Sequence, residues 1–278
     1  MNTGLSTHLF VFHELNKETV SLIGDYGFNC LEIWGMRPHF DYHNSDYVKK
    51  IKKHLYEKNI KVTSFHAPVY RFVGDGSRGL WLKLSDTNEE NRKAAVSETI
   101  KLLKAAEIFQ PLNFVLHTDI QEEKTDECIK NLMKSLSELE GLADGLGIKL
   151  ALESGIHKST ASESIINILK VINKPLYGAC VDVGHANVIE DAPSAIDRCA
   201  ANLIEIHASD NNGEADLHAV PGDGNIDWHA VMESLRDGGF TGNFVFEIMD
   251  PFRDNSKSIN ILKPILERLK KFRNVFDI

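Results

Sequence analysis

The sequence lacks the features that would place it in a secreted, membrane-bound or disulfide-stabilised class of protein. Its four cysteines are scattered and form no CxxC pair, a usage that suits a reducing compartment. No apolar run approaches the roughly 20 residues needed to span a bilayer. Residues 1–6 lack the basic and apolar regions of a signal peptide. We therefore expect a soluble, cytoplasmic protein without a membrane partner.

A net positive charge and internal linkers are also missing. The formal net charge is -9, with 31 lysines and arginines against 40 aspartates and glutamates, so nucleic acid is an unfavoured partner. No low-complexity segment or Pro/Gly-rich linker divides the 278 residues, and we predict a single domain over residues 1–278. No G-x-G-x-x-G sequence follows the first apolar run, so a dinucleotide-binding fold loses support.

Eight short apolar runs are present, and they alternate with longer amphipathic stretches. Continuous runs of Val, Ile, Leu and Phe are typical of strands that are buried on both faces of a parallel sheet. These runs are 4–10, 29–34, 62–66, 113–117, 149–153, 177–182, 203–207 and 243–247. The predicted helices are 18–26, 47–56, 88–108, 125–146, 162–172, 193–199, 227–238 and 257–272. The pattern predicts an α/β fold, a single (β/α)8 TIM barrel.

Each of the last six predicted strands ends in a residue type that binds metals. Because all strands of a parallel barrel point the same way, these side chains converge on the C-terminal mouth, where barrel active sites are built. Histidines and carboxylates at the rim of an apolar barrel would repel one another or lose solvation unless a cation held them. These six rim residues are His66, His117, Glu153, Asp182, His207 and Glu247.

Segments that follow two of these strands add three residues of the same kind. His185 follows Asp182 in a predicted loop, and Asp216 and His218 alternate in a predicted extended segment, where both side chains point the same way. The strongest ligand set combines two glutamates with an aspartate and a histidine, which suits Zn²⁺, Mn²⁺, Mg²⁺ or Co²⁺. Additional imidazoles would shift the preference towards Zn²⁺ or Mn²⁺. That set is Glu153, Asp182, His207 and Glu247.

Three residues of the first two strands are weaker candidates for the site. Glu32 is either a mouth residue or a buried carboxylate with satisfied hydrogen bonds. Trp34 belongs either to the core or to a substrate platform, and His8 is either a loop residue or a substrate contact. The other histidines have no strand-end context and are interpreted as structural or surface residues. They are His13, His39, His43, His54, His157 and His229.

The ordered series of motifs resembles the xylose isomerase-like TIM barrel superfamily. This superfamily contains sugar and sugar-phosphate isomerases and epimerases and also endonuclease IV, of AP endonuclease family 2. The resemblance extends over nearly the whole chain. Its motifs are Leu31-Glu32-Ile33, His66-Ala67-Pro68, Leu152-Glu153, Asp182-Val183-Gly184-His185, His207, Pro221-Gly222-Asp223-Gly224-Asn225-Ile226-Asp227-Trp228 and Phe246-Glu247.

The ketose 3-epimerase branch implies one divalent ion and a proton transfer. In that branch the residues that match Glu153, Asp182, His207 and Glu247 hold the ion. The two glutamates double as acid and base, and the counterpart of His185 contacts the substrate. The implied function is a metal-dependent sugar or sugar-phosphate isomerase or epimerase, which acts by proton transfer through an enediolate.

The endonuclease IV branch implies an alternative, a trinuclear zinc phosphodiesterase, and hence one to three ions per chain. Nine matching positions are filled by His66, His117, Glu153, Asp182, His185, His207, Asp216, His218 and Glu247. The sequence departs from that branch at His117-Thr118-Asp119 (His-Pro-Gly there) and at Glu153-Ser154-Gly155 (Glu-Asn-Thr-Ala-Gly there), and the DNA-penetrating loops are not recognisable. A non-catalytic sugar-binding barrel is a third possibility.

The segment 69–85 is long enough to act as a lid over the mouth. It contains Arg71, Arg78 and Lys83, and either arginine could meet a phosphate of the substrate. A plain surface loop is the alternative interpretation. Relatives in the superfamily often pair, so a homo-oligomer is a further expectation.

Overall fold

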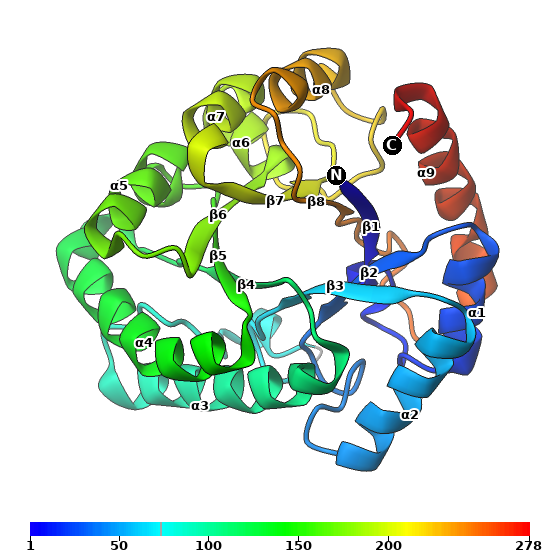
Figure 1. Ribbon diagram of the computed structural model, residues 1–278, viewed down its shortest axis with the longest axis horizontal. Helices are drawn as coiled ribbons and strands as arrows, with labels where there is room; N and C mark the ends of the chain where they lie inside the picture. The colour runs from blue at the N-terminus through cyan, green and yellow to red at the C-terminus, as the bar shows by residue number, and fades with distance from the viewer. Residues whose placement is uncertain (73) are drawn as a thin grey trace.

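The computed structural model describes residues 1–72 and 74–278, which form a closed barrel (Figure 1). Within these residues, eight parallel strands follow one another around the ring in chain order. They are β1 (Asn2–Ser6), β2 (Cys30–Trp34), β3 (Lys61–His66), β4 (Asn113–His117), β5 (Lys149–Glu153), β6 (Tyr177–Asp182), β7 (Leu203–Ala208) and β8 (Asn243–Phe246). Pairing of β1 with β8, where Leu5 lies opposite Phe246, closes the ring. The predicted fold class is confirmed.

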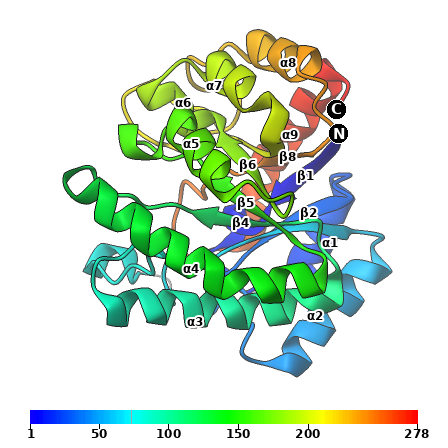
Figure 2. The ribbon, with the colours of Figure 1, turned by 60° about the vertical axis from the view of Figure 1, so that its left-hand side comes forward.

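Helices surround the strands on the outside of the barrel (Figures 1 and 2). In α2, for example, Val48, Ile51 and Leu55 are buried at helical spacing, and the Asn44 side chain accepts hydrogen bonds from the first-turn backbone. The helices are α1 (Lys17–Asp25), α2 (Ser45–Glu57), α3 (Glu89–Ala106), α4 (Thr125–Leu146), α5 (Ser162–Ile172), α6 (Val183–Ile189), α7 (Ala192–Cys199), α8 (Trp228–Asp237) and α9 (Lys263–Phe276). Across the described chain, no helix has the length and apolar character that crossing a bilayer demands.

Two segments near the mouth differ from the prediction. The first strand ends at Ser6, because the Ser6 hydroxyl accepts a hydrogen bond from the His8 backbone and begins a short 3₁₀ helix, Thr7–Phe10. His8 therefore lies in that helix rather than in the strand. Part of the predicted loop after β6 is helix α6, which begins there because Asp182 caps its first turn.

The barrel interior below the mouth is not purely apolar, because polar side chains lie there in addition to a small apolar cluster of Val115, Ala151 and Cys180. Hydrogen bonds cross this interior between strands that are not neighbours. Nδ2 of Asn113 in β4 donates to Oε2 of Glu205 in β7 (2.7 Å), and Nδ2 of Asn243 in β8 donates to the backbone oxygen of Thr63 in β3 (3.3 Å). Large apolar strand residues such as Phe65 instead belong to the main hydrophobic core with the helices. We call Glu32, Ser64, Asn113, Glu205 and Asn243 the polar floor.

Candidate metal centre and substrate cavity

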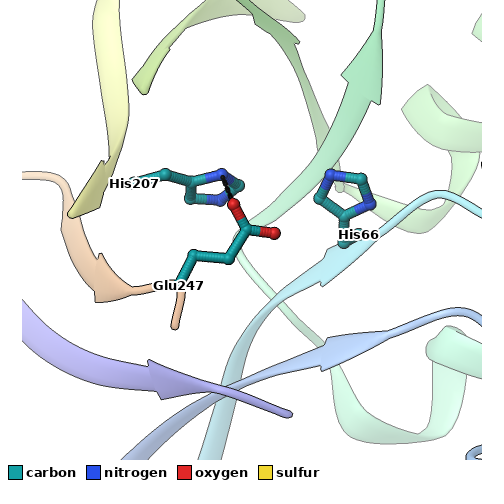
Figure 3. Close-up of side chains that lie close together, drawn as sticks. All are labelled: His66, His207 and Glu247. Carbon is teal, nitrogen blue, oxygen red and sulfur yellow. Dashed lines mark ion pairs between the residues drawn. The ribbon is translucent and has the colours of Figure 1, made fainter. Parts of the chain in front are cut away.

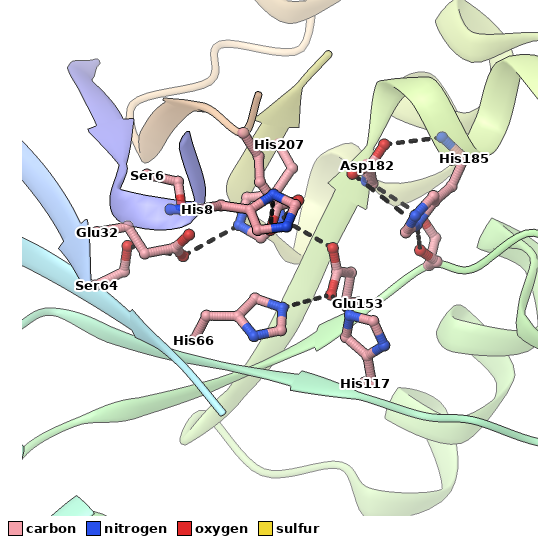
Figure 4. Close-up of polar contacts among 12 residues, drawn as sticks. Ser6, His8, Glu32, Ser64, His66, His117, Glu153, Asp182, His185 and His207 are labelled. Carbon is pink, nitrogen blue, oxygen red and sulfur yellow. Dashed lines mark hydrogen bonds and ion pairs between the residues drawn. The ribbon is translucent and has the colours of Figure 1, made fainter. Parts of the chain in front are cut away.

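The strands bring the six rim residues to one end of the barrel, and five of them, His66, His117, Glu153, Asp182 and His207, are labelled in Figure 4. The strand register places His117 opposite Glu153 and Asp182 opposite His207. Glu247 directly follows the last residue of β8. All six side chains except that of His117 are buried. The predicted convergence of acids and imidazoles is therefore present.

Glu153 lies at the centre of this group and contacts three imidazoles. Its Oε2 atom is 3.2 Å from Nε2 of His66 and 2.8 Å from Nε2 of His117. Its Oε1 atom is 2.8 Å from Nδ1 of His207. Each carboxylate oxygen thus faces different imidazole nitrogens, so Glu153 belongs to more than one of the groups that could hold an ion.

The four-residue ligand set is brought close enough to share one ion. Ligand atoms from Glu153, Asp182, His207 and Glu247 all lie within 4.8 Å of one another. Ligands bind zinc at about 2.0–2.2 Å, so atoms on opposite sides of an ion are about 4 Å apart. His66 lies beside this set and forms a further group with His207 and Glu247 within the same limit (Figure 3).

Two more groups accommodate the remaining predicted ligands. His66 and His117 form one group with Glu153, and His185, Asp216 and His218 form the other. In the second group, Oδ2 of Asp216 is 3.2 Å from Nε2 of His185 and 3.0 Å from Nε2 of His218. The segment is not extended as predicted, because His218 has a left-handed φ of 44°, yet the two side chains meet.

Unpaired oxygen atoms show that a cation fits this centre. Oδ1 of Asp182 accepts a hydrogen bond from the backbone N–H of His185 (2.8 Å), whereas its Oδ2 is buried without a donor in the described chain. Oδ1 of Asp216 is likewise buried without a hydrogen-bond donor in the described chain. A buried carboxylate oxygen without a partner is costly, and burial accordingly raises the pKa of Asp182 to about 6. Carboxylates and imidazoles together are a donor set for a divalent ion.

Two histidines balance the negative charge in the group of His185, Asp216 and His218. Burial alone would lower the pKa of His185, but the charge of Asp182 and the contact with Asp216 outweigh it and raise the pKa to about 9. Burial is likewise outweighed at His218, where Asp216 raises the pKa to about 10. Protonated imidazoles therefore balance the carboxylates, and a metal ion that binds the same nitrogens replaces protons.

Trp34 and His8 lie against Glu247 and line the cavity above the rim. Nε1 of Trp34 donates a hydrogen bond to Oε1 of Glu247 (2.9 Å) and so fixes the carboxylate. The His8 ring stacks on Trp34 with its centroid 4.4 Å away. Burial lowers the pKa of His8 to about 3, which keeps the ring neutral. Contact of either ring with a substrate stays a prediction.

Glu32 lies below the rim, within the polar floor, and is fully buried. Its Oε2 atom accepts hydrogen bonds from Oγ of Ser64 (3.3 Å) and from Nε2 of His207 (3.1 Å). It is not among the described residues that line the cavity. Of the two interpretations of the sequence, the geometry supports a buried carboxylate, which lies behind His207, a predicted ligand.

A cavity of about 570 Å³ opens above the rim. The inner lining includes six of the nine predicted ligands, and the loops after β3, β4 and β5 supply the outer lining. His157, to which the sequence assigned no role, is part of this outer lining. These six ligands are His117, Glu153, His185, Asp216, His218 and Glu247.

The predicted contact of an arginine with a phosphate finds no support in this cavity. Arg78 pairs with Asp75, and Arg71 lines a separate, smaller cavity. Among the described lining residues of the main cavity, the segment 69–85 contributes Lys83 as its one cation. Val73, which belongs to this segment, lies outside the described residues.

Sequence reasoning missed two parts of the site. The polar floor had a signal in the sequence, because Asn113 and Asn243 begin apolar strand runs with a polar side chain and Glu205 interrupts one. Tyr70 and Trp81 of the outer lining had no signal in the sequence, because only the conformation of their loop brings them to the cavity.

Comparisons with known proteins agree with this architecture. A family model described as "Xylose isomerase-like TIM barrel" matches residues 20–270. MJ1311, an uncharacterised protein of Methanocaldococcus jannaschii, is 29% identical over 280 residues, which cover 96% of this chain and 90% of that protein.

Solved structures of similar proteins share the whole barrel. A D-tagatose 3-epimerase-like protein is 26% identical with a TM-score of 0.77, covering 98% of this chain and 99% of the other. The Escherichia coli 3-keto-D-glucoside 4-epimerase YcjR is 19% identical with a TM-score of 0.77, covering 99% of both chains. The IOLI protein with a bound zinc atom is 18% identical with a TM-score of 0.77, covering 100% of this chain and 98% of the other. The last two show likeness of fold. The match to residues 20–270 shows that this chain belongs to the xylose isomerase-like TIM barrel family.

Proposed function

We propose that this protein is a divalent-metal-dependent sugar isomerase or epimerase that moves a proton next to a carbonyl group. The observation that carries the proposal is the position of Glu153, Asp182, His207 and Glu247 within reach of one ion, at the base of an open cavity. Similarity to a D-tagatose 3-epimerase-like protein supports the substrate class. The donor set favours zinc or manganese, with magnesium or cobalt as alternatives.

The two glutamates are the proposed acid and base. Oε1 of Glu153 and Oε2 of Glu247 lie 2.8 and 3.2 Å from the same atom, Nδ1 of His207. When bound, the metal ion would stabilise the negative charge that develops on the sugar oxygen. Glu153 takes the proton from the carbon, and Glu247, held by the N–H of Trp34, gives a proton to the opposite face.

Solvent deuterium exchange tests this proposal. The protein, loaded with Mn²⁺ or Zn²⁺, is incubated with D-tagatose or D-fructose in D₂O, and NMR follows the loss of the C–H signal next to the carbonyl. We expect Glu153→Gln and Glu247→Gln to slow exchange by at least about 100-fold, while the exposed Glu163→Gln retains the wild-type rate. Binding of a ketose without any exchange would instead favour the non-catalytic sugar-binding barrel.

A second candidate function rests on three of these ligand groups, which together contain all nine matching residues. Three ions in these groups are what a trinuclear zinc phosphodiesterase would need. The acidic balance of -9 and the presence of only one lysine among the described lining residues oppose a DNA substrate. Metal analysis that finds about one ion per chain supports the epimerase, and incision of duplex DNA at an abasic site would establish the nuclease.

A further inference from the structure

A series of aromatic rings leads from the metal centre to the opening of the cavity. Ring centroids of His66 and Trp34 are 4.9 Å apart, those of Trp34 and Tyr70 6.1 Å, and those of Tyr70 and Trp81 5.4 Å. Exposure increases from 0% at His66 and 5% at Trp34 to 46% at Trp81. The proposed proton transfer uses neither Tyr70 nor Trp81, which we call the outer aromatic pair. Exposed aromatic rings on a cavity wall mark a binding surface.

The cavity is larger than one sugar ring needs. Its volume of about 570 Å³ lies within the roughly 300–1,000 Å³ that holds drug-sized ligands, and a single hexose is smaller than such ligands. The proposed function places the carbonyl-bearing sugar at the inner end, beside Glu153 and Glu247. The outer end, beside the outer aromatic pair, has room for a second ring.

The charge of the outer lining favours a neutral occupant. Asp119, Glu122 and Glu123 line the cavity, whereas Lys83 is the one lysine or arginine among its described lining residues. Three carboxylates repel a phosphate dianion. Ile156, which is 37% exposed, adds apolar surface to the lining. This combination suits a saccharide, whose ring faces present C–H groups and whose edges present hydroxyl groups.

We propose that the outer aromatic pair forms a second sugar subsite, and that the substrate is a neutral saccharide of two rings. The first ring carries the carbonyl and lies at the metal centre, so this inference rests on the proposed function. The second ring, joined through a glycosidic bond, packs a face on Trp81. No bond of the second ring is made or broken, because the reaction remains a proton transfer on the first ring.

The test compares D-fructose with two disaccharides that carry it, isomaltulose and lactulose, and with fructose 6-phosphate. Deuterium exchange gives kcat/KM for each sugar with the metal-loaded protein, and calorimetry gives Kd. We expect at least one disaccharide to exceed fructose by about tenfold in kcat/KM and in affinity, and the phosphate to fall below fructose.

Two variants, at positions of equal side-chain exposure, test whether the outer aromatic pair causes the preference for a disaccharide over fructose. Trp81→Ala should reduce the disaccharide-to-fructose ratio about tenfold. Phe252 is also 46% exposed but is not among the described lining residues, so Phe252→Ala should leave that ratio unchanged. Equal effects of the two variants would overturn the inference.

The outcomes separate this inference from the proposed function. Exchange into fructose without a preference for either disaccharide overturns the subsite alone. A preference for fructose 6-phosphate overturns it as well. If no sugar exchanges deuterium, yet calorimetry shows tighter binding of a disaccharide that Trp81→Ala abolishes, the subsite stands and the proposed function fails.

Discussion

Nε2 of His207 lies 3.1 Å from Oε2 of Glu32, while Nδ1 of the same ring faces Glu153 and Glu247. A carboxylate that accepts the Nε2–H fixes the tautomer in which Nδ1 has a free lone pair. Glu32 also accepts a hydrogen bond from Ser64, so the carboxylate is itself held in place. The polar floor thus orients the ring that the proposed metal centre depends on.

Glu32→Gln should weaken metal binding by about 10- to 100-fold, because an amide no longer selects this tautomer. Competition with a chelator of known affinity measures the change for Zn²⁺ and Mn²⁺. Glu205→Gln is the matched control in the same polar floor. Burial, and then the charge of Glu32, raises the pKa of Glu205 to about 8, so a neutral amide replaces a largely neutral acid. Equal loss of affinity in both variants would contradict the role of Glu32.

Removal of metal should lower the thermal stability of the protein. Without an ion, the buried carboxylates of the centre repel one another and Oδ2 of Asp182 has no partner. An ion present at about 100 times its Kd contributes about 2.7 kcal/mol, which corresponds to about 5–10 °C in Tm for a chain of this size. Thermal unfolding with excess Zn²⁺ and with a chelator measures the difference. Asp182→Asn should reduce this difference, and a wild-type Tm that does not respond to metal would argue against the centre.

The sequence predicted the barrel and its rim because both follow from local patterns. Parallel strands buried on both faces read as continuous apolar runs, and their common direction carries the last residue of each to one end. Glu153 and Asp182 could therefore be assigned to one site before any contact was known. Helix α6 was not predicted because it is short. Its N-terminal signal is present, because Asp182 precedes Gly184 and His185 as a capping residue precedes the first turn of a helix.

The remaining parts of the site depend on contacts between segments far apart in the chain. Asn113 meets Glu205 across the interior of the barrel, and a strand pattern does not say which polar residue faces inward. Trp34, Tyr70 and Trp81 form one series of rings only because the segment between β3 and α3 brings Tyr70 and Trp81 next to the end of β2. Neither relation has a sequence period, so neither could be predicted from spacing.

Asp210 should be essential for the stability of the loop that carries Asp216 and His218. It is fully buried, and its carboxylate accepts hydrogen bonds from the backbones of Asn211, Gly222 and Ile226 and from the indole of Trp228. Its backbone also pairs with that of Ala219. Asp210→Asn places an amide donor against these N–H groups and should cost about 2–4 kcal/mol.

Chemical denaturation of Asp210→Asn and of Asp223→Asn measures this cost within one loop. Asp223 is partly exposed and pairs with Arg268 at the surface, so its replacement should cost less than about 1 kcal/mol. Comparable losses in the two variants would show that the buried contacts of Asp210 are not what stabilises the loop. Close packing limits relaxation here, because a Cβ on Gly224 would lie 2.2 Å from Oδ1 of Asp210.

His39 should make the folded protein less stable in mild acid. Burial lowers its pKa to about 4, although its Nδ1–H donates a hydrogen bond to the backbone oxygen of His13. Below pH 6.5 His39 is protonated in the unfolded chain but stays neutral in the folded protein. The free energy of unfolding therefore falls as the pH decreases from about 6.5 to about 4. Between pH 7 and pH 5 this loss amounts to about 2 kcal/mol. Chemical denaturation at both pH values should show that His39→Gln loses about 2 kcal/mol less unfolding free energy than the wild type. The control His229→Gln, at an exposed position, should keep the wild-type pH dependence. An unchanged pH dependence in His39→Gln would contradict the assignment.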